Sequence, residues 1–378
     1  MALPRSAYVQ EGQEGVYHCF NRCVRRAFLC GYDPVTQRDF SHRKTWLVDR
    51  LRHLAAIFAV EVCTYAVMEN HYHTILRTRP DIVATWSDQE VATRWLTLFP
   101  HYSRKKDVVE PPTDKQISAL ADCTERIAEL RKRLSSLSWF MGHLNEFIAR
   151  AANKEDDVKG RFWESRFKCQ NLLDDSAIAA CMVYVDLNPI RAALAATPEE
   201  SDFTSIQERI RAWHKEMMAP GSVPGESNQN SQSGSFSQDM QKLEDMADGS
   251  NAIPECIPFN SLYAPSSCWL CPIQSDSQRR GILPMTATEY FDLVDKSGRI
   301  LRSDKRGAID AGMAPILLRI GAIPEAWMDT VSLFASKFRL AAGLVSSLRS
   351  FADQLGRRWL TGVAAARTAF AVSPPQSA

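Results

Sequence analysis

Apolar and polar positions along the first part of the chain follow two different periods. Val60–Val67 is rich in β-branched and aromatic residues and predicts a strand, and His71–Arg77 predicts a returning strand after a tight turn. Apolar residues between positions 44 and 59 recur at helical spacing and predict an amphipathic helix. Residues 16–20 are apolar and aromatic and predict a strand ahead of that helix. This order of strand, helix, strand and strand favours an α+β sheet layered with helices.

The later parts of the chain carry mostly helical patterns. Asp174 and Asp175 stand where an N-cap is expected, ahead of a helical run over residues 178–187. Thr286 and Glu289 have the spacing of a capping box, in which each side chain bonds the other residue's backbone amide. A further amphipathic stretch covers residues 327–360. We therefore expect a mainly helical C-terminal region.

One segment, Pro220–Asp248, breaks the composition of the chain. It is rich in Ser, Gln, Asn, Gly and Pro and poor in large apolar residues. Such a segment buries too little surface to offset the entropy that it would lose on ordering. We predict a flexible linker over residues 216–254, which divides the chain into a domain over residues 1–215 and a region over residues 255–378.

Composition narrows the class of protein further. The 378 residues are 45% hydrophobic and 24% charged, and the net charge of +1 means that attraction to nucleic acid must come from a local basic surface. No run of about 18 apolar residues occurs, and residues 1–10 lack the apolar stretch of a secretory signal, which favours a cytoplasmic protein without a membrane span. The ten cysteines are expected to be free thiols. Cys268 and Cys271 form a CxxC pair, for which a zinc site with Cys256 is the less favoured interpretation.

His71 and His73 are the first candidates for chemistry. Side chains at positions i and i+2 of a strand point to the same face, so the two imidazoles can bind one cation. Imidazole is a common ligand of divalent metals. From the spacing alone, two half-exposed strand histidines without a metal are the alternative interpretation.

Tyr184 and Asn188 are the second candidates. They are four residues apart, so a helix places them one turn apart on the same face. Spacing alone also allows Tyr184 to be an aromatic residue of the core. Because Pro189 suits the first turn of a helix, Asn188 is also a candidate N-cap, a role that does not exclude metal binding.

Basic residues interleaved with aromatic residues are the third feature. They suit a nucleic-acid strand, because cations contact the phosphates and aromatic rings stack on the bases. The candidates for DNA binding are Arg22, Arg25, Arg26, Arg161, Trp163, Arg166 and Lys168. The alternatives are a solvated charged face for the cations and core packing for Trp163.

Four segments, in this order, resemble the HUH single-tyrosine transposases, in particular the REP-associated tyrosine transposase branch. The segments are Tyr17–Cys23 (YHCFNRC), Val67–His73 (VMENHYH), Gly160–Lys168 (GRFWESRFK) and Tyr184–Leu194 (YVDLNPIRAAL). The second segment contains the family's pair of histidines around one residue, and the fourth begins at the position of the family's nucleophile. The resemblance covers roughly residues 15–195 of the chain.

The resemblance implies a ferredoxin-like antiparallel sheet with helices, in which the histidine pair lies on a central strand. It implies cleavage and strand transfer of single-stranded or hairpin DNA of the REP type through a covalent 5′-phosphotyrosine. By position, Tyr184 is the nucleophile, His71 and His73 are metal ligands, and Asn188 is a third ligand. The implied cofactor is a divalent cation, Mg²⁺ or Mn²⁺, although imidazoles bind Zn²⁺ or Ni²⁺ more tightly.

Some features depart from the family pattern. Tyr72 stands between the two histidines in place of the usual hydrophobic residue, and Glu69 replaces a frequent proline. Tyr72 is a competing nucleophile, but strand alternation points it away from His71 and His73. Residues 80–138 resemble an insertion relative to short family members, and the C-terminal region has no counterpart in them.

Other interpretations stay open on the sequence. The same fold can serve a non-catalytic DNA- or RNA-binding regulator. A pair of histidines around one residue also occurs in metal-dependent amidohydrolases, which call for further histidines and a carboxylate on later strands. The active site is built within one chain or shared across a homodimer, and the C-terminal region is a candidate module for binding a partner.

Overall fold

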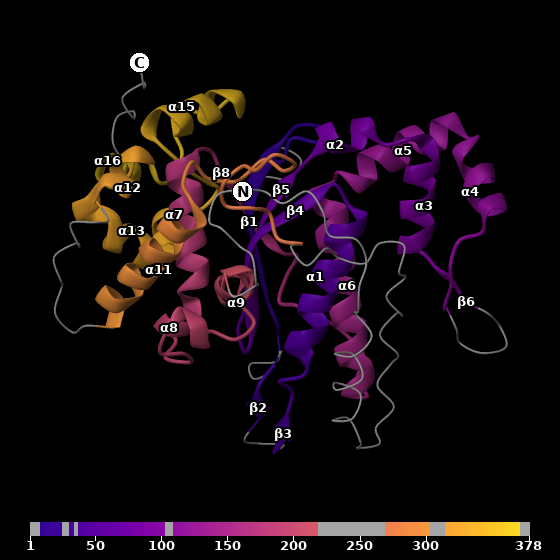
Figure 1. The fold of residues 1–378 in the computed structure, drawn as a ribbon, viewed down its shortest axis with the longest axis horizontal. Helices are drawn as coiled ribbons and strands as arrows, with labels where there is room; N and C mark the ends of the chain where they lie inside the picture. The colour runs from indigo at the N-terminus through magenta and orange to yellow at the C-terminus, as the bar shows by residue number, and fades with distance from the viewer. Residues whose placement is uncertain are drawn as a thin grey trace.

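The computed structural model describes residues 8–24, 30–33, 37–102, 109–217, 269–302 and 314–370. Its central element is a five-stranded sheet with helices on both faces, a mixed α+β arrangement (Figure 1). The strand order is β4 (Val60–Val67), β5 (His71–Thr78), β1 (Gly15–Arg22), β8 (Lys168–Leu172) and β9 (Ala341–Ala342). Two short pairs lie outside this sheet: β2 (Tyr32–Asp33) with β3 (Arg38–Asp39), and β6 (His101–Tyr102) with β7 (Val109–Glu110).

The sheet agrees with the predicted strands and differs at one edge. β4 has the predicted bounds, and apart from the short β2–β3 pair the predicted order of strand, helix, strand and strand is confirmed, with α1 (Arg43–Ile57) between β1 and β4. The strands β4, β5, β1 and β8 pair antiparallel, as expected. β9, however, pairs parallel with β8, where Asn171 lies opposite Ala341. The sheet is therefore mixed. The sequence could not predict β9, because two residues are too few to show the alternation of apolar and polar positions that marks a strand.

One face of the sheet packs against α1 and α6 (Leu137–Glu155), as Figure 1 shows. Leu47, Leu51 and Leu54 of α1 are fully buried there, because their helical spacing places them on one stripe. They join a hydrophobic cluster that includes Tyr72 of β5. Four smaller helices extend this layer: α2 (Pro80–Thr85), α3 (Asp88–Leu98), α4 (Asp114–Ala121) and α5 (Thr124–Leu134). We call this side of the sheet the closed face.

The opposite side, which we call the open face, packs against α7 (Asp175–Asp186). Every residue of α7 except Asp175 is buried, because the helix is apolar around its circumference and lies between the sheet and the C-terminal helices (Figure 1). Asp174 caps this helix as predicted, accepting a hydrogen bond from the backbone amide of Ala177 at 3.1 Å. The further helices of this side are α8 (Asn188–Arg191), α9 (Ser205–Met217), α11 (Ala287–Arg302), α12 (Ala314–Arg319), α13 (Trp327–Ser332), α14 (Phe334–Lys337), α15 (Val345–Gln354) and α16 (Val363–Ala369), with 3-10 turns at Pro198–Glu200 and Pro324–Ala326.

Besides the cap at Asp174, one further helix-end prediction is confirmed, and two other predictions about helices are wrong. The backbone amide of Glu289 donates to the Thr286 hydroxyl at 3.2 Å, and the amide of Thr286 donates to the Glu289 carboxylate at 2.8 Å, which completes the predicted capping box. Residues 327–360 do not form one amphipathic stretch of helix, because the backbone becomes extended at Phe338 and then forms β9. Asn188 is not an N-cap, because it is the first residue inside α8 and its side-chain nitrogen donates to the backbone carbonyl of Tyr184 in α7.

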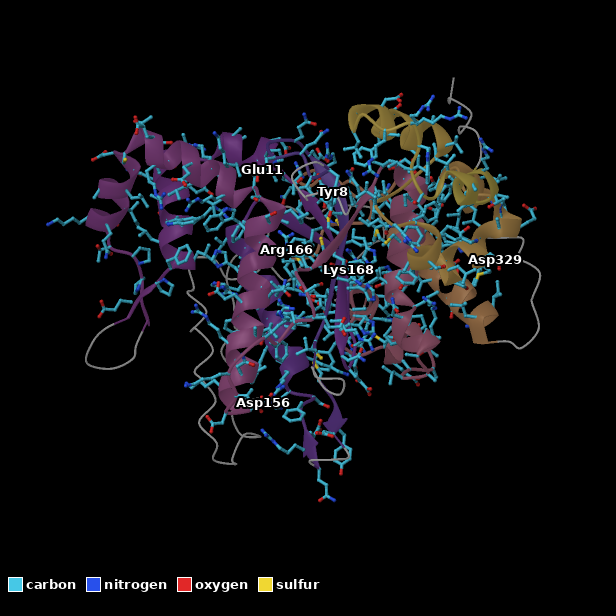
Figure 2. The ribbon with its side chains drawn as sticks, turned by 180° about the vertical axis from the view of Figure 1, so that it is seen from behind. Tyr8, Glu11, Asp156, Arg166, Lys168 and Asp329 are labelled. Carbon is cyan, nitrogen blue, oxygen red and sulfur yellow. The ribbon has the colours of Figure 1, made fainter. Side chains whose placement is uncertain are left out.

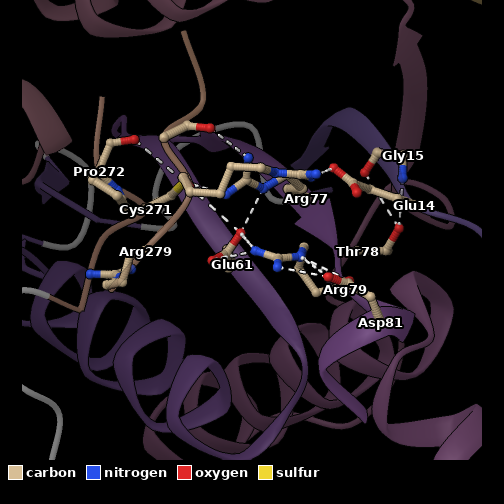
Figure 3. A network of polar contacts seen from close by, with 12 residues as sticks. Glu14, Gly15, Glu61, Arg77, Thr78, Arg79, Asp81, Cys271, Pro272 and Arg279 are labelled. Carbon is tan, nitrogen blue, oxygen red and sulfur yellow. Dashed lines mark hydrogen bonds and ion pairs between the residues drawn. The ribbon is translucent and has the colours of Figure 1, made fainter. Parts of the chain in front are cut away.

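A buried arginine, Arg77, holds the segment after Trp269 against the sheet (Figure 3). Its guanidinium donates to the Glu61 carboxylate at 2.6 Å, to the backbone carbonyl of Arg280 at 2.6 Å and to the Cys271 sulfur at 3.2 Å. Removing one partner of such a buried pair typically costs about 3–5 kcal/mol, because the other charge is left without compensation. The chain beyond residue 269 is therefore anchored to the sheet at this network as well as at β9.

Several predictions concern cysteines, the linker and membranes. The described cysteines are free thiols, as expected, and Cys271 of the CxxC pair is one of them. Cys256, Cys268 and the linker residues 218–254 lie outside the described residues. Within the described ranges, every helix is too short or too polar to cross a membrane.

Candidate active site

A pocket of about 250 Å³ lies where β1 ends and β5 begins. We call it the tyrosine pocket. Its lining residues come from both strands, from α7, from β8 and the segment before it, and from α14: Phe20, Asn21, Arg22, His71, His73, Glu164, Ser165, Lys168, Tyr184 and Ala335. The fold therefore brings the predicted histidine pair and the predicted nucleophile into one cavity.

His71 and His73 lie on the same face of β5, as their spacing predicts. Their ring centroids are 5.0 Å apart and their planes nearly perpendicular. His73 is buried, with 5% of its surface exposed, whereas His71, the first residue of the strand, is half-buried. Both histidines line the tyrosine pocket.

A chain of hydrogen bonds fixes which nitrogen of His73 carries the proton. The Gln170 side-chain oxygen can only accept, so His18 Nδ1, 3.3 Å away, donates to it. A neutral His18 then accepts at Nε2, and the Nδ1 of His73, 2.9 Å away, is the donor. This tautomer leaves the Nε2 lone pair of His73 free, which is the arrangement that orients metal-binding histidines.

His71 is held in the same tautomer by its neighbour. Its Nδ1 donates to the side-chain oxygen of Asn70 at 2.6 Å, so its Nε2 also carries a lone pair. Burial lowers the pKa of His71 and the pKa of His18 to about 4, and burial together with His18 lowers the pKa of His73 well below its usual value. All three imidazoles are therefore neutral at pH 7, the state in which histidine binds a cation.

The donor set fits a cation held by two histidines. No group of three or more His, Cys, Asp or Glu residues is placed to share a metal anywhere in the described part of the chain. Asn188, the predicted third ligand, is buried beside the tyrosine, and its side-chain nitrogen donates to the backbone carbonyl of Tyr184 at 2.9 Å. His71 and His73 would therefore hold the cation. Asn188 does not belong to the lining of the tyrosine pocket, so the remaining positions would fall to water or a substrate oxygen.

Tyr184 faces the histidines from α7. Its ring lies edge-on to His73 and to His18, with centroids 5.7 Å and 6.0 Å apart, and its other side packs on Phe334 of α14. The guanidinium of Arg191 lies 5.0 Å from the centre of the ring. Burial raises the pKa of Tyr184, and the positive charge of Arg191 opposes that rise. The phenol is therefore protonated at rest and has one cation placed to stabilise its anion.

Tyr72, the competing tyrosine, lies on the closed face, as strand alternation predicts. Its side chain is fully buried, and its hydroxyl donates to the Asn145 side-chain oxygen at 3.0 Å. Its ring packs edge-on against Trp163. Tyr72 therefore has no access to the pocket that holds His71 and His73.

The predicted DNA-binding residues divide between the pocket, the core and the surface. Arg22 and Lys168 line the tyrosine pocket, and Arg166 lies beside it. Trp163 packs in the hydrophobic core of the closed face, where its indole nitrogen donates to the Asn145 carbonyl at 2.9 Å. Arg161 is exposed and donates to the Glu164 backbone at 3.3 Å. Arg25 and Arg26 lie outside the described residues.

Sequence reasoning missed three residues that the structure places at the site. His18 of β1 bonds His73, and Gln170 of β8 bonds His18, on strands that are adjacent only in the folded sheet. The signal for Arg191 was present, because it stands seven residues after Tyr184 and therefore on the same side of the helical segment. His18 and Phe20 are two residues apart on β1 and therefore point to the same face of the sheet. Phe20 pairs with His73 on the neighbouring strand β5.

Comparison with known proteins gives little beyond this geometry. No protein-family model matches the chain, and no curated protein matches it. One solved structure that is similar shows a REP-associated tyrosine transposase bound to a REP hairpin, with 11% sequence identity and a TM-score of 0.33 over 56% of this chain and 86% of that chain. A likeness at this identity and this TM-score carries no conclusion about activity, so the residues of the tyrosine pocket alone decide what the chain is proposed to do.

Proposed function

We propose that the chain cleaves and rejoins single-stranded or hairpin DNA with Tyr184 as its nucleophile and a divalent cation, Mg²⁺ or Mn²⁺, at His71 and His73. The observation that carries this proposal is that the tyrosine shares one pocket with two neutral imidazoles whose Nε2 atoms are left free by their own hydrogen bonds. The resemblance of four sequence segments to the HUH single-tyrosine transposases supports the same chemistry. Such an enzyme would act on DNA in the cytoplasm.

The fold is proposed to be ferredoxin-like around this site. The strand order β4-β5-β1-β8 is antiparallel, with the histidine pair on β5, inside the sheet. The helices α1 and α6, which follow β1 and β5 in the chain, lie together on the closed face. This arrangement leaves the open face free for α7, which carries the tyrosine.

The chemistry requires a stronger nucleophile than a resting phenol. A tyrosine with a pKa near 10 is only about 0.1% ionised at pH 7, a cost of roughly 4 kcal/mol, and burial increases that cost here. A bound divalent cation would act as a Lewis acid on the phosphate and contribute several kcal/mol to the transition state. Arg191 stabilises the phenolate, and Arg22 and Lys168 on the pocket wall attract the phosphate.

The bond changes follow from a displacement at phosphorus. The Tyr184 oxygen forms a bond to the phosphorus and gives its proton to solvent, while the bond from phosphorus to the 3′-oxygen breaks and that oxygen takes up a proton. The products are a 5′-phosphotyrosine and a free 3′-hydroxyl. The reverse reaction with another 3′-hydroxyl transfers the strand and restores the tyrosine.

A gel assay for covalent adducts tests this proposal. Full-length protein, Tyr184→Phe and Tyr72→Phe are each incubated with labelled hairpin oligonucleotides that carry single-stranded flanks, in Mn²⁺ and again with a chelator. We expect an adduct with the parent protein and with Tyr72→Phe, and none with Tyr184→Phe or after chelation. An adduct that persists in Tyr184→Phe would assign the chemistry elsewhere. Binding of the hairpins without any adduct would support a non-catalytic DNA- or RNA-binding regulator.

A further inference from the structure

A second pocket, of about 540 Å³, adjoins the tyrosine pocket and is the larger of the two. We call it the basic pocket. The two pockets share Phe20, Ser165, Lys168 and Ala335 in their walls. A flexible ligand can therefore pass from one pocket to the other along this common wall.

Positive charge is concentrated in the basic pocket. Arg166, Lys168 and Arg339 line it and are exposed, and no carboxylate belongs to its lining. Within the described ranges these three cations form no ion pair, whereas exposed arginines elsewhere do, such as Arg150 with Glu146 at 2.6 Å. Because the whole chain carries a net charge of only +1, the pocket is a local attraction for an anion.

One residue in the wall of the basic pocket carries an unsatisfied donor. Gln170 lines the pocket and is 3% exposed, and its side-chain nitrogen has no hydrogen-bond partner among the described residues. Its side-chain oxygen is occupied by His18. A buried amide nitrogen of this kind requires an acceptor, and the oxygens of a phosphate supply one.

The C-terminal region supplies one wall of this pocket. Arg339 follows Phe338, which is 1% exposed and packs against Phe334 and Phe370, so the backbone that carries the arginine is held by the core. Two residues later the chain joins β8 through β9. Figure 2 shows Arg166 and Lys168 in the middle of the molecule, between α6 and the C-terminal helices.

We propose that the basic pocket binds backbone phosphates of the single DNA strand that flanks the scissile phosphate, and that Arg339 makes the C-terminal region part of this path. A single strand fits because the site is a concave pocket with aromatic residues between its cations, rather than a broad surface for a duplex. The inference rests on the proposed function for the position of the scissile phosphate. The binding of the strand is measurable without any cleavage.

Salt-dependent binding of an unstructured oligonucleotide tests the inference. Fluorescence anisotropy with a labelled oligo-dT is measured in a Tyr184→Phe background, so that no adduct forms. We expect Arg339→Gln to weaken binding roughly threefold to tenfold and to reduce the slope of log affinity against log salt by about 0.7, the value for one lost phosphate contact on a single strand. Arg339→Lys keeps the charge and is expected to keep the slope.

A matched variant separates this role from a general loss of charge. Arg349, on α15, is exposed and does not line the pocket, so Arg349→Gln is expected to leave the slope unchanged. Equal slopes for Arg339→Gln and Arg349→Gln would overturn the inference, and so would a loss of slope in Arg339→Lys. Thermal unfolding of each variant confirms that the fold is intact. The adduct assay is scored separately, so a failure of cleavage with an intact Arg339 effect would refute the proposed function alone.

Discussion

The closed and open faces of the sheet place two tyrosines in opposite situations. Tyr72 on the closed face is enclosed by Trp163 and Asn145, and its hydroxyl has a protein acceptor at 3.0 Å. Tyr184 on the open face lines a cavity and has the guanidinium of Arg191 5.0 Å from its ring. Burial raises the pKa of both phenols, but only Tyr184 has a cation that opposes the rise. The environment, rather than the residue type, decides which tyrosine is available for chemistry.

The polar groups on the two faces differ in the same way. On the closed face, the Asn145 side-chain oxygen accepts from Asn21 at 2.9 Å as well as from Tyr72, and its nitrogen donates to the Met141 carbonyl at 2.7 Å. On the open face, the hydrogen bonds of His18 and His73 end at a nitrogen with a free lone pair. A satisfied network stabilises one arrangement, whereas an unfinished one can receive a ligand. The closed face therefore stabilises the fold, and the open face keeps a group available for a ligand.

The largest expected effect comes from breaking the closed face. Trp163→Ala removes a buried indole together with its hydrogen bond to the Asn145 carbonyl, so we expect the free energy of unfolding to fall by about 3–5 kcal/mol. Urea unfolding measures this change. Trp359→Ala is the control, because Trp359 is 72% exposed and its removal is expected to change stability by less than about 0.5 kcal/mol. A loss of unfolding free energy in Trp163→Ala as small as that in the control would show that Trp163 does not stabilise the sheet.

The contrast between the faces also explains which features the sequence predicts. β4, α1 and the shared face of His71 and His73 follow from local periodicity, which the sequence displays directly. β9 and the contacts of His18 with His73 and Gln170 depend on strands that meet only after folding. Asn188 shows where prediction from the local sequence fails. The proline after it favours an N-cap, but α8 follows α7 so closely that the Asn188 side-chain nitrogen donates to the Tyr184 backbone carbonyl instead. Periodicity predicts elements, and tertiary pairing completes the site.

An intermediate effect is expected from a change on the open face. Arg191→Met removes the cation near Tyr184, so the pKa of the phenol rises further and less phenolate is present at a given pH. We expect adduct formation at pH 7.5 to slow about tenfold to hundredfold, equivalent to roughly 1.4–2.7 kcal/mol in the barrier. The rise of the rate with pH is expected to move to higher pH, a shift that a purely structural role would not produce. Arg191→Lys should restore part of the rate, and an unshifted pH profile in Arg191→Met would argue against the electrostatic role.

The smallest effect is expected from removing one oxygen on the closed face. Tyr72→Phe keeps the packing against Trp163 and loses the hydrogen bond to Asn145, whose side-chain oxygen still accepts from Asn21. The free energy of unfolding should therefore fall by only about 0.5–1.5 kcal/mol in urea titrations. The rate of adduct formation should equal that of the parent protein, because the lost hydroxyl lies on the face away from the pocket. A slowed rate with unchanged stability would mean that the two faces are coupled through β5, since Tyr72 stands between His71 and His73 on that strand.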